Sequence, residues 1–140
     1  MNRGFRRTLL LDLNMFLGCT AVAGGVALIV GWIKIPLSSL AGSPFSDFTV
    51  PAVLLTLIGG SAMLAAELVH LRKGIGLPVS AVVGGAIIVF EIVEWSVIGF
   101  AWLQAAYMAI GLLIGSLAVW IRLAPFRVCA SSRVPRHAVH

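Results

Sequence analysis

The hydrophobic positions of this chain gather into four long runs, separated by shorter stretches that contain the polar residues and prolines. The runs extend over about residues 9–33, 50–71, 77–100 and 102–123. Each is close to the roughly 20 residues that an α-helix needs to cross a hydrocarbon core about 30 Å thick. The runs lack the alternation of apolar and polar residues that is typical of barrel strands. The pattern predicts an all-α integral membrane protein, folded as a four-helix bundle.

Breaks in the pattern define the connections. The segment "IPLSSLAGSPFSDFT" (35–49) is the one long loop; we expect Thr49 to be the N-cap of the second helix, with Pro51 in its first turn. The segment "RKGIGLP" (72–78) predicts a tight turn. The third connection, around residues 99–102, is so short that the third and fourth helices must be antiparallel neighbours.

Composition and charge exclude two classes of protein. Of 140 residues, 60% are hydrophobic and 11% are charged, and the mean hydropathy is +1.06; an ordinary soluble domain has about 25% charged residues. The net charge of +5 does not predict a nucleic-acid partner, because the basic residues lie at the ends of the apolar runs and form no basic folded surface. The partner that the composition predicts is the lipid bilayer.

The basic residues indicate an orientation instead. Of the ten Lys and Arg residues, all except Lys34 fall on one side of the predicted bundle. The positive-inside rule then places both termini in the cytoplasm and the long loop outside. We therefore divide the chain into a four-helix domain, residues 1–123, and a basic cytoplasmic tail, residues 124–140.

The first run has a competing interpretation. The start "MNRGFRRTLLLDLNMFLGC" combines basic residues, an apolar stretch and a cysteine, as a lipoprotein or twin-arginine signal does. Asp12 and Asn14 interrupt that apolar stretch, however, and Phe16 is a poor fit three positions before Cys19. The chain also stays apolar after Cys19, so we expect an uncleaved first helix. Neither Cys19 nor Cys129 has a second thiol nearby in the sequence, which excludes a CxxC redox or zinc motif.

Small residues four positions apart occur in every run. Such pairs allow helix backbones to approach closely in a membrane, although glycine and alanine are common in any membrane helix. We interpret them as evidence for a tight bundle and not for a specific dimer. The pairs are Ala21/Gly25, Ala62/Ala66, Ala81/Gly85 and Gly111/Gly115.

Polar and ionisable residues within the runs fall at two depths. The inner polar layer lies near the predicted cytoplasmic ends and contains Asp12, Asn14, Glu67 and His70. We interpret it mainly as interfacial acids that pair with interfacial bases, because charges near helix ends reach the headgroups.

The outer layer contains the main candidates for an ion- or ligand-binding site: Glu91, Glu94, Lys34, Gln104 and Tyr107. Glu91 lies near mid-bilayer, where a carboxylate is costly and usually faces protein or a water-filled cavity. Glu91 and Glu94 lie three residues apart, and two carboxylates this close repel each other. We therefore expect one of the two to be protonated and Lys34 to be the counter-charge of the other. The alternative is a buried hydrogen-bonded cluster that fixes the helix register; we favour the functional interpretation slightly.

A metal centre is not expected. Glu67-x-x-His70 and Glu91-x-x-Glu94 have the spacing that di-iron bundles use. Their depths differ by roughly 15 Å along the membrane normal, at 1.5 Å per residue, so one metal cannot bridge them. His70 is the single histidine within a run, so we predict neither haem nor another cofactor, and no catalytic residue.

The stretch "GSPFSDFTVPAVLL" (42–55) and the four-run layout resemble a group of small, uncharacterised bacterial four-span membrane proteins of similar length. The layout is also similar, in size and span count, to DoxX-like membrane proteins. The first resemblance covers most of the chain and implies a multi-pass protein of the bacterial inner (cytoplasmic) membrane. Neither brings a site residue. In the loop, we expect Asp47 to cap the second helix, and Phe45 and Phe48 to lie on the outer rim.

Three functions are compatible with this sequence. The one we favour narrowly is an accessory or scaffold subunit that acts through helix contacts with a larger complex. Whatever its function, we expect the protein to form a homo-oligomer or to belong to a larger membrane complex. The alternative is an oligomeric transporter or channel for protons or cations that uses Glu91 and Glu94. A membrane enzyme or a redox protein is the third; the sequence offers no nucleophile–base set for an enzyme and no second histidine within a run for a haem.

Overall fold

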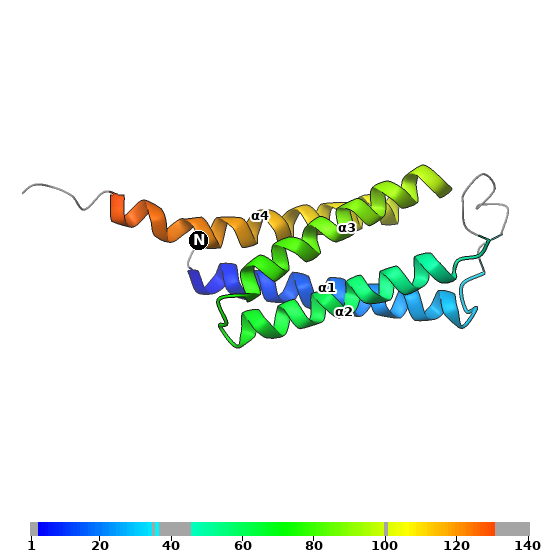
Figure 1. Ribbon diagram of the computed structural model, residues 1–140, viewed down its shortest axis with the longest axis horizontal. Coiled ribbons are helices and arrows are strands. Elements are labelled where there is room, and N and C mark those ends of the chain that lie inside the picture. Colours follow the sequence, from blue (N-terminus) through cyan, green and yellow to red (C-terminus); the bar gives the residue numbers. More distant parts are fainter. Residues whose placement is uncertain (1–2, 35, 37–45, 100, 131–140) are drawn as a thin grey trace, which may run out of the picture.

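The computed structural model describes the backbone of residues 3–34, 36, 46–99 and 101–130, with side chains from residue 4 as far as residue 123. These ranges form four α-helices, which pack side by side along one long axis (Figure 1). This confirms the predicted all-α four-helix bundle, and each helix contains a segment long and apolar enough to cross a membrane. The helices are α1 (Arg3–Ile29), α2 (Thr49–His70), α3 (Gly76–Ile98) and α4 (Trp102–Ala130).

The two ends of the bundle differ in charge. At one end, here called the basic end, lie Arg6, Arg7, Arg72, Lys73 and Arg122. At the other, here called the loop end, α1 and α3 finish and α2 and α4 begin. Which end faces the cytoplasm stays a prediction.

The first helix ends four residues earlier than predicted, because of Gly31. This glycine has a φ of 74°, in the left-handed region that side chains disfavour. The N–H of Trp32 donates to the carbonyl of Ala27 (2.9 Å), and the N–H of Gly31 donates to that of Leu28 (3.2 Å). This is the Schellman pattern that terminates helices. At its other end α1 begins at Arg3, because the helix continues past the hydrophobic run into its basic flank.

The residue at the N-cap of the second helix differs from the predicted one. Thr49 is its first residue and Phe48 occupies the N-cap position without a side-chain bond, so the predicted Thr49 N-cap is wrong. The predicted role of Asp47 is confirmed, because its Oδ1 accepts a hydrogen bond of 2.9 Å from the Thr49 N–H. Phe45 lies outside the described residues.

The last helix continues beyond the predicted boundary at residue 123 and reaches Ala130. The remaining residues of the predicted tail, 131–140, lie outside the described part of the chain.

Glycines set the helix pairing. A Cβ placed on Gly59 of α2 would lie 2.8 Å from the Val22 nitrogen and 2.9 Å from the Gly18 oxygen, both on α1. A Cβ on Gly84 of α3 would lie 2.7 Å from the Gly111 oxygen on α4. These are backbone-to-backbone contacts, which only small residues permit. The helices therefore form two close pairs, α1 with α2 and α3 with α4, and the contacts between the pairs are less extensive.

One predicted small-residue pair is wrong. In α3, a Cβ on Gly85 would meet nothing within 4 Å, and Gly85 is exposed. The contact with α4 is made by its neighbour Gly84.

The turn between α2 and α3 contains one strained residue. Arg72 has a φ of 54°, and its N–H donates to the Val69 carbonyl, while that of Lys73 donates to Leu68. Arg72 thus occupies the left-handed position of a Schellman motif, where glycine is preferred. We expect Arg72→Gly to raise the free energy of unfolding by about 1 kcal/mol. Lys73→Gly removes the same charge without relieving the strain, so the same gain in both variants, measured by unfolding in mixed micelles, would contradict this explanation.

Candidate functional site

A stripe of buried residues runs along the inner face of α3 and ends in a carboxylate. Ser80, Val83, Ile87 and Glu91 recur every three or four residues, which places them on one face of a helix. All four are buried, and Glu91 is 1% exposed. Glu91 therefore occupies a core position that an apolar residue would normally fill.

Glu91 lines a cavity of about 250 Å³ in the half of the bundle toward the loop end. All four helices contribute to its wall. Its polar lining side chains are Glu91, Glu94, Gln104 and Tyr107. The other residues that line it are Gly24, Leu28, Ile33, Leu55, Phe90, Ile98, Ala101 and Leu103.

The two acidic side chains of this cavity lie close enough to interact, and Glu94 also approaches Gln104. The Oε2 atom of Glu91 is buried and has no hydrogen-bond partner. A buried polar atom without a partner is costly, and native structures contain few of them. This oxygen therefore marks the place where a ligand, a proton or water would be held.

Gln104 has two roles at the start of α4. Its Oε1 accepts a hydrogen bond of 2.9 Å from the Ala101 N–H, which is half of a capping box. Because the oxygen is used in this way, the amide nitrogen is the end available to the Glu94 carboxylate. The side chain thus fixes both the helix start and one wall of the site.

Lys34 is the one outer-layer candidate that does not line the cavity. It is exposed at the loop end and is not among the residues that line the cavity. No lysine or arginine lines the cavity within the described part of the chain. The predicted counter-charge role of Lys34 is therefore not supported, and the two carboxyl groups lack a basic partner among the lining residues.

The predicted inner polar layer separates into a buried and an exposed part. Asn14 is fully buried, and its Nδ2 donates to the Leu10 carbonyl (2.8 Å) and the Ser80 Oγ (3.3 Å). Asp12, Glu67 and His70 are exposed on the outside of the bundle, away from the buried Asn14. Ser80 was not predicted from the sequence, although it shares a helix face with Ile87 and Glu91 by its spacing.

An apolar layer separates the Asn14–Ser80 contact from the cavity. Leu17, Ile87 and Ile114 are fully buried members of the core. Ile87 lies between Ser80 and Glu91 on α3, Leu17 lies between Asn14 and the cavity residue Gly24 on α1, and Ile114 follows the cavity residue Tyr107 by seven positions on α4. None of the three lines the cavity; along their helices they lie beyond it, toward the basic end. A continuous polar path through a single copy of the chain is thus interrupted at this layer.

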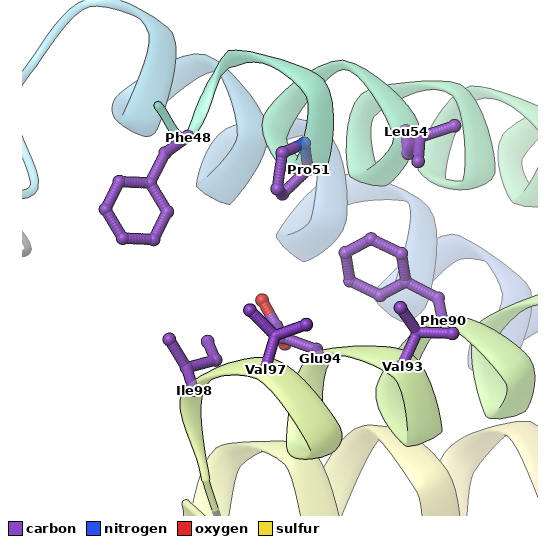
Figure 2. Close-up of a pocket in the computed structure, with 8 residues that line it drawn as sticks. All are labelled: Phe48, Pro51, Leu54, Phe90, Val93, Glu94, Val97 and Ile98. Carbon is purple, nitrogen blue, oxygen red and sulfur yellow. The ribbon is translucent and has the colours of Figure 1, made fainter. Parts of the chain in front are cut away.

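A second, smaller opening of about 50 Å³ lies between α2 and α3 at the loop end. Figure 2 shows the lining side chains in two groups, one at the start of α2 and one on α3, with Glu94 in the α3 group beside Val97. Glu94 is the one acidic residue of this cleft. The remaining lining residues are Phe48, Pro51, Leu54, Phe90, Val93, Val97 and Ile98.

No metal-binding group is found in the described part of the chain: no three His, Cys, Asp or Glu side chains come together there. Cys19 is a free, exposed thiol, and the side chain of Cys129 lies outside the described residues. At the basic end, Arg6 stacks on Trp120, with its guanidinium carbon 4.1 Å from the ring centroid. This contact ties α1 to α4.

Comparison with known proteins gives no family. No family model matches the chain, and neither a curated protein nor a solved structure matches it. The likeness to small bacterial four-span proteins and to DoxX-like proteins therefore carries no assignment. The molecule is a four-helix protein with four candidate membrane spans.

Proposed function

We propose that this protein binds a small cation within the membrane and moves it, with Glu91 and Glu94 as the binding groups. The observation that carries the proposal is the unpartnered Oε2 of Glu91, which is buried against a cavity that also contains Glu94. An intramembrane carboxylate in a cavity is typical of ion and substrate pathways.

Electrostatics favours a positively charged occupant. The lining residues that the structure describes provide two carboxyl groups and no basic side chain. A cation about 4 Å from a carboxylate gains about 4 kcal/mol at an effective dielectric constant of about 20. An anion would meet repulsion at the same place.

The apolar layer beyond the cavity bears on the mechanism. Leu17, Ile87 and Ile114 are fully buried core residues and lie between the level of the cavity and the basic end. A permanently open channel through one copy is incompatible with this layer. Movement of a cation across the membrane therefore requires a second conformation or a path between copies, and we propose the oligomeric arrangement on this ground.

The test replaces both acids by glutamine. We expect Glu91→Gln/Glu94→Gln to bind methylammonium at least about tenfold more weakly than the parent protein, because the amides keep the shape of the site and lose its charge. Binding is measured by calorimetry with the protein in nanodiscs. In proteoliposomes, we expect the same variant to lose cation or proton flux.

The matched control is Glu67→Gln, which neutralises an exposed acid on α2 outside the cavity. It is expected to bind and transport as the parent does. Equal binding and flux in the parent and in the double variant, with both folded, would refute the proposal.

The second candidate function is the accessory or scaffold subunit. The observation that favours it is that α4 buries the smallest share of its span within the bundle, so much of its apolar surface is free for another helix. Native mass spectrometry of protein extracted gently from its own membrane tests it. A defined complex with another protein supports this function, and a homo-oligomer alone counts against it.

We also propose the orientation with both termini in the cytoplasm and the loop end outside, in a bacterial inner membrane. The cavity then lies in the outer half of the bilayer. The support is the concentration of Arg and Lys at the basic end.

A further inference from the structure

We infer that the ligand is a lipophilic amine, one positive charge on an apolar tail, and that it reaches Glu94 sideways from the bilayer through the cleft between α2 and α3. This inference rests on the proposed function, because it names the class of cation that the site takes. It adds a route, a chemical class and a second set of residues.

The first support is that Glu94 belongs to two spaces. It lines the interior cavity together with Glu91, and it also lines the cleft between α2 and α3 (Figure 2). Phe90 and Ile98 are likewise shared by both. The carboxylate therefore stands at the junction between the interior site and the lateral opening.

The second support is the surface on which the cleft opens. Leu54 on α2 and Val93 on α3 line it and are 45% and 49% exposed, so the cleft reaches the outside of the bundle. This outside is apolar and lies within the candidate spans, where it meets lipid. The contacts of α2 with α3 are less extensive than those within each helix pair, and Figure 1 shows the two helices diverging toward the loop end.

The third support is size. The cavity, at about 250 Å³, falls below the roughly 300–1,000 Å³ that is typical of sites for whole drug-sized ligands. It is large enough for a charged headgroup. The narrow cleft, lined by apolar side chains apart from Glu94, suits the tail that follows the headgroup.

The fourth support is the kind of oxygen that the site offers. A hard metal cation requires about six oxygen ligands. The side-chain oxygens that line the cavity are those of the Glu91 and Glu94 carboxyl groups, the Tyr107 hydroxyl and the Gln104 amide, which already accepts a hydrogen bond from Ala101. An ammonium group has few N–H donors and needs fewer acceptors than a metal cation. Phe90 and Tyr107 also line the cavity, and aromatic rings attract such a cation.

The experiment measures binding of methyl-, butyl- and octylammonium to the full chain in nanodiscs by calorimetry, with empty nanodiscs subtracted. Octylammonium is expected to bind at least about tenfold more tightly than butylammonium, because each buried methylene adds affinity. Octyl sulfate, with the same tail and a negative charge, is expected not to bind. Equal binding of octyl sulfate would overturn the assignment of an amine.

Variants of residues that line the cleft distinguish binding of the tail in the cleft from binding of the charged group in the cavity. Val97→Trp fills the cleft and is expected to weaken octylammonium binding at least about tenfold while leaving methylammonium unchanged. The control is Val89→Trp, on the same helix, 62% exposed and lining neither the cleft nor the cavity. Leu54→Trp fills the cleft from the α2 side and replaces Val97→Trp if that variant does not fold.

The outcomes distinguish the two proposals. In two cases methylammonium binds through the two acids but the lateral route fails: octylammonium binds no tighter than butylammonium, or it binds with the same affinity to the parent and both cleft variants. Either result overturns the lateral route for a lipophilic amine and leaves the proposed function standing. If no amine binds in a way that depends on Glu91 and Glu94, the cation-binding function itself fails.

Discussion

Replacing Glu91 by leucine is expected to make the protein more stable, raising the free energy of unfolding by about 2 kcal/mol. Glu91 is 1% exposed, and its Oε2 has no hydrogen-bond partner. Burying a polar group without a hydrogen-bond partner costs about 1–3 kcal/mol, and an apolar residue of similar volume removes that cost. Unfolding by sodium dodecyl sulfate in mixed micelles, followed by circular dichroism, measures the change.

This result would decide between the two interpretations of the acidic pair. If Glu91 belongs to a cluster that fixes the helix register, its loss lowers the stability. If it is retained for binding, its loss raises the stability and removes the binding, which is the usual conflict between activity and stability at functional sites. Ser96→Leu, an exposed polar-to-leucine change on the same helix, is the control and is expected to alter stability by less than about 0.5 kcal/mol.

Much of the site was predictable from the sequence because helices in a membrane have few arrangements. The short connection between α3 and α4 forces the end of one beside the start of the other. It thereby brings Gln104 and Tyr107 to the level of Glu91 and Glu94, and the structure places all four on one cavity. The depth of each residue follows from its distance to the helix end.

What the sequence does not determine is the face on which each residue lies when the hydrophobic pattern is continuous. Asp12 and Asn14 have almost the same depth, but at about 100° per residue they lie on nearly opposite sides of α1. One is exposed and the other is buried against Ser80. Both were predicted to lie in one inner layer because only their depth along the helix was used. Lys34 was misplaced for a related reason, since the chain beyond Gly31 no longer follows the helix.

The cavity could not be predicted from the sequence. It lies where α2 and α3 diverge toward the loop end, and its lining comes from all four helices, so its shape depends on side-chain packing between elements far apart in the sequence. The sequence offers several equally spaced small residues in α3, and spacing alone favours neither Gly84 nor Gly85 as the contact with α4. The structure shows that Gly84 approaches Gly111 and that Gly85 faces outward.

Gly84→Leu is therefore expected to be the most disruptive single substitution discussed, lowering the free energy of unfolding by about 3 kcal/mol. A Cβ at this position would lie 2.7 Å from the Gly111 oxygen and 2.9 Å from the Gly115 nitrogen. Both are backbone atoms of α4, so no side chain can rotate away, and α3 must separate from its partner. The same micelle unfolding measurement applies.

Gly85→Leu is the matched control for this substitution, one residue away on the same helix. A Cβ there meets nothing within 4 Å, and leucine favours the helix more than glycine does. Its effect on stability is expected to stay within about 1 kcal/mol and to be favourable. If both variants lose the same stability, the α3–α4 contact does not depend on the close backbone approach at Gly84. The packing that holds Glu91 and Glu94 opposite Gln104 would then need another explanation.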